Sequence, residues 1–219
     1  MKPTLYAHPF ASYCWKVLIA LYENHTAFTY RSLGPEDPAA ATELEALWPL
    51  KRFPVLVDEG RPVIESSVII EYLALRYPGP VRLLPTDPEA ALEVRFLDRF
   101  FDNYVMTPMS RIVANQLRPQ DRRDSYGVDE AKAALEAAYR WLEGVMEGRA
   151  WAVGDNFTLA DCAAAPSLFY ADWVHPIAER FPHVRGYRAR LLARPSVSRT
   201  VDEARPFRQF FPLGAPDRD

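Results

Sequence analysis

Hydrophobic positions in the first 80 residues alternate between strand-like and helix-like patterns. Short runs rich in β-branched or aromatic residues predict strands at Thr4–Ala7, Phe28–Ser32, Val55–Val57 and Pro62–Ile64. Amphipathic stretches between them predict helices over Ser12–Glu23, Ala39–Leu47 and Ser67–Arg76. Gly60 in "VDEGRP" marks a hairpin between the last two strands. This order predicts one sheet of four strands, parallel first and antiparallel at its edge.

The rest of the chain is almost entirely helix-like. Periodic segments predict helices at Glu89–Asn115, Val128–Glu147, Leu159–Asp172, Ile177–Arg180 and Val184–Ala193. Between the two patterns, "YPGPVRLLPTDPEA" holds four prolines, which cannot continue a helix and mark a connector. We therefore predict an α/β domain over residues 1–78, a Pro-rich linker over 79–88 and an all-α domain over 89–219.

The stretch "DNFTLADCAAA" carries a strong helix-start signal. Thr158 stands at the N-cap and Asp161 three residues later, which resembles a capping box with Asp in place of Glu or Gln. Phe157 and Cys162 flank the cap where a hydrophobic staple stands. The helix that follows is nearly all apolar, which predicts the buried centre of a bundle. We interpret Asp161 as structural, not catalytic.

Composition narrows the classes of function. The chain of 219 residues is 49% hydrophobic and 25% charged, which is ordinary for a globular protein. Its net charge of −3 gives no reason to expect nucleic acid as a partner. No apolar run approaches the roughly 18–20 residues that span a bilayer, so no membrane partner is expected. Its two cysteines lie far apart, which predicts no disulfide, no metal site and a cytoplasmic location.

In "LYAHPFASYCWKVLIAL" a Pro-containing turn leads into a helix. A helix N-terminus directs free N–H groups and partial positive charge at whatever lies in front of it, so it can hold an anion such as a thiolate. Ala11, Ser12, Tyr13 and Cys14 stand at this junction.

Two further stretches fit a peptide with charged ends. In "KRFPVL", Pro54 directly precedes a strand. If the Phe53–Pro54 bond is cis, the backbone of Phe53 turns outward, where it can pair with an extended peptide. The alternative is that Pro54 only makes the start of the strand rigid. In "VIESSVIIEYL", Ser66 or Ser67 caps a helix whose N-terminus suits a carboxylate, and Glu65 can accept from an ammonium. A plain helix cap explains Ser66 equally well.

These stretches, together with "LLPTDP", "DNFTLADCAAA" and "LLARPSVSRTVDEARP", resemble the cytosolic glutathione transferases over essentially the whole chain. The pattern is similar to bacterial members of the serine-dependent, theta- and zeta-like classes. The resemblance implies a thioredoxin-like N-terminal domain followed by an all-α helical-bundle domain. It also implies glutathione as co-substrate, a homodimer, and neither a metal nor a nucleotide cofactor.

The resemblance also assigns positions in the glutathione site. Pro54 matches the cis-proline of the family, and the backbone of Phe53 the partner of the cysteinyl unit. Glu65 and Ser66 match the pair that holds the γ-glutamyl group. Lys51, with Arg52 beside it, stands where a basic residue meets the glycyl carboxylate.

The position of the residue that stabilises the glutathione thiolate departs from the family pattern. Ala11 occupies the position of the serine in the serine-dependent classes, so Ser12 at the helix start is the first candidate. The alternatives are Tyr6 in the first strand and the backbone N–H groups; an N-cap role is the competing interpretation of Ser12. Tyr13 is expected to point aside. Cys14 is expected to be buried, although a thiol reductase acting through it is a third reading.

The apolar electrophile is expected between the first turn and the first long helix of the second domain. Candidate pocket residues are Phe10, Tyr104, Met106, Met109 and Arg111, with Trp173 as a further wall. The resemblance also raises the expectation that Asp98 or Asp102 reaches the ligand of a partner subunit.

The sequence therefore predicts an enzyme that attacks an apolar electrophile with the glutathione thiolate, with side peroxidase or isomerase activity. A non-catalytic glutathione-binding or regulatory module is the alternative, because Ala11 replaces the expected serine.

Overall fold

The first part of the chain forms a four-stranded sheet flanked by helices. In this computed structural model, which describes residues 2–219, the strand order is β2-β1-β3-β4. Strand β1 pairs with β2 in parallel and with β3 antiparallel, and β3 pairs with β4 antiparallel, as predicted. The elements are β1 (Thr4–Ala7), α1 (Ser12–Glu23), β2 (Thr29–Ser32), α2 (Pro38–Leu47), β3 (Val55–Asp58), β4 (Arg61–Ile64) and α3 (Ser66–Arg76).

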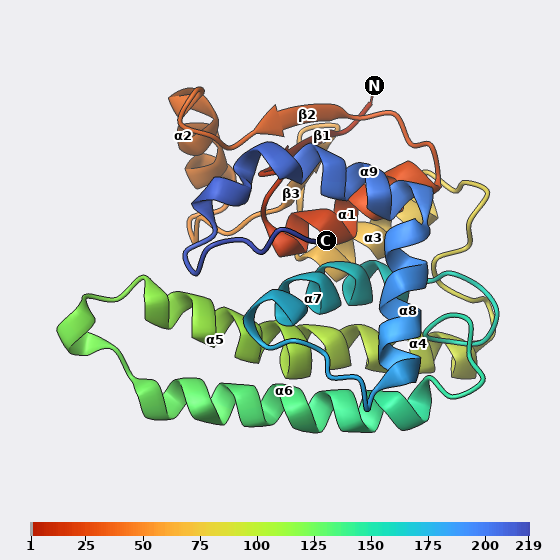
Figure 1. Cartoon of the computed structure of the whole chain (residues 1–219). Coiled ribbons are helices and arrows are strands. Elements are labelled where there is room, and N and C mark those ends of the chain that lie inside the picture. Colours follow the sequence, from red (N-terminus) through yellow and green to blue (C-terminus); the bar gives the residue numbers. More distant parts are fainter. Residues whose placement is uncertain (1) are drawn as a thin grey trace.

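The second part is helical and lies against α1 (Figure 1), and its side chains also hydrogen-bond to side chains of α3. Its elements are α4 (Pro88–Phe100), a π-helical segment η1 (Phe101–Met106), α5 (Thr107–Gln116), η2 (Gln120–Arg122), α6 (Ser125–Val145), α7 (Leu159–Val174), α8 (Pro182–Ala193), α9 (Pro195–Ala204) and η3 (Arg205–Phe210). The fold class is therefore as predicted. Helix α3 ends at Arg76 and α4 begins at Pro88. The linker bounds of 79–88 stay a prediction.

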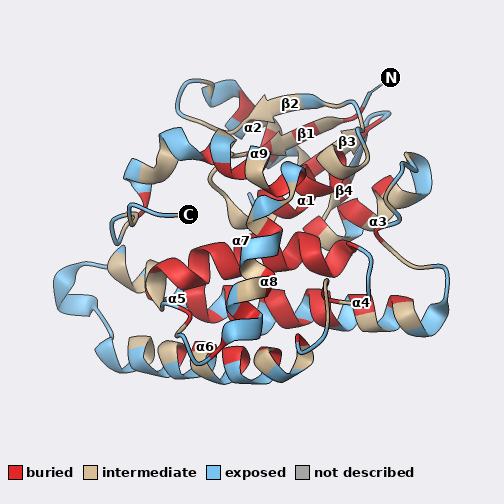
Figure 2. Cartoon of the chain, turned by 45° about the vertical axis from the view of Figure 1, so that its right-hand side comes forward, coloured by how far each residue is buried: buried red, intermediate tan, exposed pale blue. Residues whose placement is uncertain are grey.

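Helix α7 is the centre of the core. It packs against α1 on one side and against α4, α5 and η1 on the other, and Figure 2 shows its ribbon buried along most of its length. Its start is fixed by Asp161, whose carboxylate accepts from the backbone N–H groups of Thr158 and Ala152, each at 2.8 Å, and from the Tyr187 hydroxyl at 2.6 Å. The structural role predicted for Asp161 is confirmed.

Three predicted elements differ from the structure. The helix predicted over Glu89–Asn115 is interrupted by η1, a wider π turn that no local sequence signal announces. Residues 177–180 form a turn between α7 and α8 instead of a short helix. Helices α9 and η3 were not predicted, although Pro195 and Pro206 stand at first-turn positions where proline is tolerated.

Candidate functional site

A cavity of about 690 Å³ lies where the N-termini of α1 and α3 meet α5, α7 and the end of the chain. The first 66 residues supply its "polar half", which consists of Ser12, Lys51, Arg52, Phe53, Pro54, Glu65 and Ser66. The "apolar half" combines Phe10 with residues of the helical part, namely Met109, Val113, Ala114, Leu117, Tyr170, Phe210 and Phe211. The pocket thus joins a charged, hydrogen-bonding wall to a hydrophobic one.

Helix α1 presents an unsatisfied N-terminus to this pocket. Its N-cap is Ala11, which has no side chain to cap the helix. The backbone N–H groups of Ser12 and Tyr13 donate to no described residue, and the Ser12 hydroxyl makes no hydrogen bond within residues 2–219. The N-cap interpretation of Ser12 is therefore wrong, and its hydroxyl and two N–H groups remain available to an anion.

Helix α3 presents a second such N-terminus. Glu65 precedes it with a φ of 72°, in the left-handed region, and lies exposed at the pocket. Ser66 follows as the first helical residue, and the N–H groups of Ser66 and Ser67 have no acceptor among the described residues. A carboxylate fits this end, and an ammonium fits Glu65 beside it.

The Phe53–Pro54 peptide bond, which is cis, lines the same pocket as the two helix ends. Phe53 and Pro54 both line the pocket directly before β3. Lys51 also lines it, and its ammonium forms an exposed ion pair with Glu45 at 2.8 Å. The structure therefore brings together all the residues predicted for glutathione binding; their individual roles stay a prediction.

The other thiol-handling candidates lie in different environments. Tyr6 does not line the pocket, and its hydroxyl donates to Glu43 at 2.9 Å. Tyr13 does line it, and burial raises the pKa of its hydroxyl to about 12. Cys14 is fully buried, and burial raises the pKa of its thiol to about 12. A buried thiol that stays protonated is a poor nucleophile, which argues against a reductase acting through Cys14.

Of the predicted electrophile residues, Phe10 and Met109 line the pocket. Tyr104 and Arg111 lie instead in a separate groove of about 440 Å³ between α4–α5 and α6, which corrects that expectation. Met106 is 1% exposed and belongs to the core. The physical reason is helical geometry: residues seven apart share one face, and Tyr104 and Arg111 share the one that is turned toward α6. Trp173 does not line the pocket either; it packs behind Phe211.

Sequence reasoning missed Val113, Leu117, Tyr170, Phe210 and Phe211. Val113 and Leu117 follow Met109 at four-residue steps, so the three residues lie on one face of the helix. This spacing could have identified Val113 and Leu117 from the predicted Met109. Tyr170 lies on the helix predicted as the buried centre of the bundle, and its hydroxyl donates to the Phe10 carbonyl at 2.9 Å, which fixes the apolar half to the first turn. Nothing in the local sequence identified the last two phenylalanines as pocket walls.

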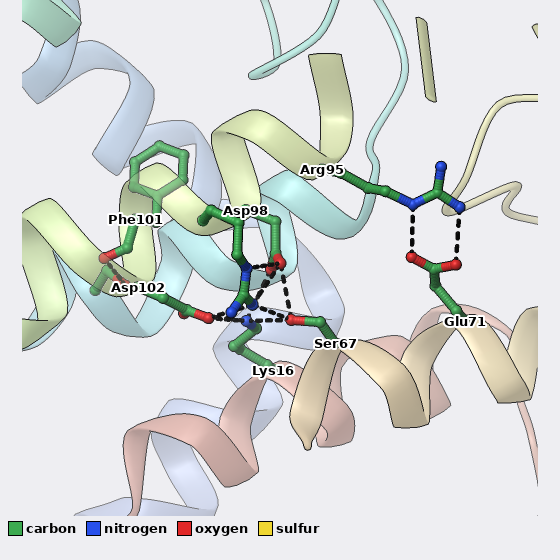
Figure 3. A network of polar contacts seen from close by, with 9 residues as sticks. Lys16, Ser67, Glu71, Arg95, Asp98, Phe101 and Asp102 are labelled. Carbon is green, nitrogen blue, oxygen red and sulfur yellow. Dashed lines mark hydrogen bonds and ion pairs between the residues drawn. The ribbon is translucent and has the colours of Figure 1, made fainter. Parts of the chain in front are cut away.

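A buried ion cluster joins the two parts of the chain (Figure 3). Lys16 on α1 is 1% exposed, and its ammonium contacts Asp98 at 2.7 Å and Asp102 at 2.8 Å. Ser67 on α3 accepts from Lys16 at 3.1 Å and donates to Asp98 at 2.8 Å. Burial disfavours ionised Asp98, but Lys16, with further hydrogen bonds from Arg99 and Ser67, outweighs burial and holds the pKa of that carboxyl below its usual value. Arg99 closes the cluster with ion pairs to both aspartates.

This cluster corrects the expectation that Asp98 or Asp102 reaches the ligand of a partner subunit. Both carboxylates are buried and point at Lys16 of their own chain. They hold α4 and η1 against α1 and α3, whose N-termini line the polar half.

Comparison with known proteins assigns both parts of the chain to one class. The family model of the glutathione S-transferase N-terminal domain matches residues 5–81, and that of the C-terminal domain matches residues 105–195. A probable maleylacetoacetate isomerase from Caenorhabditis elegans is 28% identical over 173 residues, 78% of this chain and 79% of that protein. A glutathione S-transferase-like protein from a Fusarium species is 33% identical over 157 residues, 68% of this chain and 70% of the relative.

The solved structure of a glutathione S-transferase from Methylobacterium radiotolerans, in complex with glutathione sulfonate, superimposes with a TM-score of 0.79 at 30% identity. The match covers 92% of this chain and 95% of that one. The chain therefore belongs to the glutathione S-transferase family. This result confirms the predicted fold class, the glutathione transferase class of enzyme and glutathione as co-substrate. Within residues 2–219, no helix is both long and apolar enough to cross a membrane.

Proposed function

We propose that this transferase ionises the thiol of glutathione at the N-terminus of α1 and conjugates it to an apolar electrophile. The observation that carries the proposal is that one pocket combines two helix N-termini, whose first N–H groups have no acceptor among the described residues, with a hydrophobic wall. A tripeptide with charged ends fits the first wall, and an uncharged reactive carbon fits the second.

The proposed pose of glutathione follows the polar half. The γ-glutamyl carboxylate lies at the N-terminus of α3 with Ser66, and the γ-glutamyl ammonium lies at Glu65. The cysteinyl unit pairs with the backbone of Phe53 beside cis Pro54, and the glycyl carboxylate meets Lys51 or its neighbour Arg52. In this pose the cysteinyl sulfur lies at the N-terminus of α1, because Ser12 lines the same pocket as the residues that anchor the two ends.

The energy of thiol ionisation is within reach of this site. Lowering a thiol pKa by about two units takes about 2.7 kcal/mol. A hydrogen bond to a charged acceptor contributes about 1.5–3 kcal/mol, and a partly buried helix N-terminus contributes up to about 2 kcal/mol. The Ser12 hydroxyl together with the free N–H groups of α1 therefore suffices. The thiol proton passes to solvent, sulfur bonds to the electrophilic carbon, and the leaving group departs with its bonding electrons.

An apolar electrophile is favoured over an anionic one. Maleylacetoacetate, the substrate named for several relatives, carries two carboxylates. The lining of the apolar half contains no cationic side chain, and the basic residues of the pocket, Lys51 and Arg52, belong to the polar half. Conjugation is therefore the primary activity proposed, and isomerase or peroxidase activity is secondary.

We also place the enzyme in the cytoplasm as a homodimer. Both cysteines are buried and unpaired, which fits a reducing compartment. On α4, η1 and α6 the exposed apolar side chains Leu92, Phe96, Tyr104 and Trp141 form a face that suits a second copy of the chain.

The test is an ultraviolet difference titration of bound glutathione in the wild type, Ser12→Ala and Ser12→Thr. We expect a wild-type thiol pKa about two units below that of free thiol. It should rise by about one to two units in Ser12→Ala and stay low in Ser12→Thr, which keeps the hydroxyl. A low value unchanged in Ser12→Ala would transfer the role to the N–H groups of α1. Tight binding without any depression of the pKa would establish the non-catalytic binding module.

A further inference from the structure

Tyr13 is the second residue of α1 and lines the pocket beside Ser12. It was expected to point aside, and the structure corrects that expectation. Its side chain is partly buried and packs against the hydrophobic core, yet its hydroxyl makes no hydrogen bond within residues 2–219. A tyrosine hydroxyl that is withdrawn from bulk water usually has a hydrogen-bond partner. A bound ligand can supply the partner that this hydroxyl lacks.

The direction of the Tyr13 side chain follows from its place on α1. Residues three apart share one face of a helix, and Lys16 stands three residues after Tyr13. The Lys16 ammonium lies 6.0 Å from the centre of the Tyr13 ring and 3.1 Å from the Ser67 hydroxyl of α3. Tyr13 therefore lies on the face of α1 that is turned toward the start of α3. The γ-glutamyl end of glutathione lies there in the proposed pose.

The charges that act on the Tyr13 hydroxyl come from the same side. Burial is the main cause that raises the pKa of this hydroxyl to about 12. The carboxylates of Asp102, Glu65 and Asp98 raise the pKa further, and the Arg99 guanidinium opposes them. Glu65 directly precedes α3, and the other three residues belong to the buried ion cluster. The hydroxyl therefore keeps its proton at neutral pH and is a neutral donor within reach of the α3 N-terminus.

We propose that Tyr13 is a binding residue for the γ-glutamyl carboxylate of glutathione, to which its hydroxyl donates a hydrogen bond. This inference rests on the proposed function and adds a donor from α1 to the free N–H groups of Ser66 and Ser67 on α3. The carboxylates of Glu65 and Asp102 disfavour a further anion nearby, so the ligand carboxylate needs such donors. A hydrogen bond to an ionised acceptor is roughly twice as strong as one between neutral groups.

The assignment gives two adjacent residues of α1 different tasks. Ser12 serves the cysteinyl sulfur, and Tyr13 serves the amino-acid end of the same ligand. The two tasks can be separated by experiment, because the first changes the thiol pKa of bound glutathione and the second changes only the affinity.

Three peptides isolate the groups of the γ-glutamyl end. Glutathione carries a carboxylate and an ammonium there, glutaryl-cysteinylglycine keeps only the carboxylate, and 4-aminobutyryl-cysteinylglycine keeps only the ammonium. Calorimetry measures the Kd of each peptide for the wild type and for Tyr13→Phe, which keeps the ring and removes the hydroxyl. We expect the Kd of glutathione and of the glutaryl peptide to rise roughly tenfold, and that of the aminobutyryl peptide to stay constant. The melting temperature should not change, because the hydroxyl has no partner among the described residues.

The ultraviolet titration of bound glutathione supplies an independent readout. The thiol pKa should be the same in Tyr13→Phe as in the wild type, because the hydroxyl donates to the carboxylate and not to the sulfur. A higher thiol pKa in the variant would assign Tyr13 to the sulfur and overturn the inference. An equal loss of affinity for the aminobutyryl peptide would assign the hydroxyl to the ammonium and overturn it as well.

Tyr6→Phe is the matched control. Tyr6 stands on β1 outside the pocket, and its hydroxyl already donates to Glu43. Its loss should leave all three dissociation constants unchanged. A Kd of glutathione that does not rise in Tyr13→Phe, or that rises equally in Tyr6→Phe, would contradict the assignment. A wild type that binds none of the three peptides would instead overturn the proposed function itself.

Discussion

The two halves of the pocket are built by different means. The polar half comes from three short stretches at points of restricted backbone geometry: the start of α1, the cis Phe53–Pro54 bond and left-handed Glu65 before α3. The apolar half combines Phe10 with residues of α5, of α7 and of the last part of the chain, and these residues share only their hydrophobic character. The polar half therefore depends on local backbone conformation in the first part of the chain. The apolar half depends on how segments that are distant in the sequence pack together.

The supports behind the two halves differ in the same way. The buried cluster of Lys16, Asp98 and Asp102 holds α4 against the helices whose ends form the polar half. Aromatic contacts among Trp173, Tyr170 and Phe211 support the apolar half. Loss of the ion cluster should therefore lower both the stability of the protein and its affinity for glutathione. Changes to exposed residues of the apolar half should alter only the KM of the electrophile.

The largest effect is expected from Lys16→Met. This change keeps most of the side-chain volume but leaves two buried carboxylates with only Arg99 as counter-ion. Removing one partner of a buried ion pair costs about 3–5 kcal/mol, so the free energy of unfolding in urea should fall by that amount. The Kd of glutathione should rise, because α1 and α3 lose their common anchor.

Arg95→Met is the matched control. Arg95 on α4 pairs with Glu71 on α3 at 2.8 Å (Figure 3), so it bridges the same two parts of the chain. Unlike the buried cluster, this pair is exposed to solvent. Its loss should cost no more than about 1 kcal/mol. Equal losses in the two variants would show that burial of the cluster contributes nothing.

Local signals explain how far the sequence could predict the structure. Some features depend only on a residue's own backbone or on residues a few positions away, so the local sequence predicts them. They are Asp161, Pro54 and the helix starts near Ser12 and Ser66. The four-stranded sheet was predictable for the same reason, because short β-rich runs alternate with amphipathic helices.

Tertiary effects explain what could not be predicted. The π segment η1 interrupts the first long predicted helix without a local sequence signal, and Tyr104 and Arg111 line the groove toward α6 instead of the pocket. The ion pairs of Lys16 could not be predicted, because its partners Asp98 and Asp102 are more than 80 residues away. The local sequence around Phe210 and Phe211 did not indicate that these residues line the pocket.

A smaller effect, confined to the polar half, is expected from Ser66→Ala. The Ser66 hydroxyl makes no hydrogen bond within the described residues, so its loss should leave the melting temperature nearly unchanged. A hydrogen bond to a carboxylate contributes about 1.5–3 kcal/mol, which predicts a roughly ten- to hundredfold rise in the Kd of glutathione measured by calorimetry. Ser110→Ala removes a hydroxyl from the α5 side of the same cavity and should leave that Kd unchanged. A similar rise in both variants would erase the distinction between the halves.

The smallest effect is expected in the apolar half, from Leu117→Ser. Leu117 is 70% exposed, so the fold gains little from it, and the free energy of unfolding should not change. A bound electrophile covers only part of this side chain, which at about 25 cal/mol per Å² of apolar surface predicts a roughly two- to threefold rise in the KM of the electrophile. The Kd of glutathione should stay constant, and Leu75→Ser, at an exposed leucine of α3 outside the pocket, should change neither constant. A Leu117→Ser variant that weakens glutathione instead would mean that the two halves of the pocket are not separable, because an apolar residue would then be controlling the polar site.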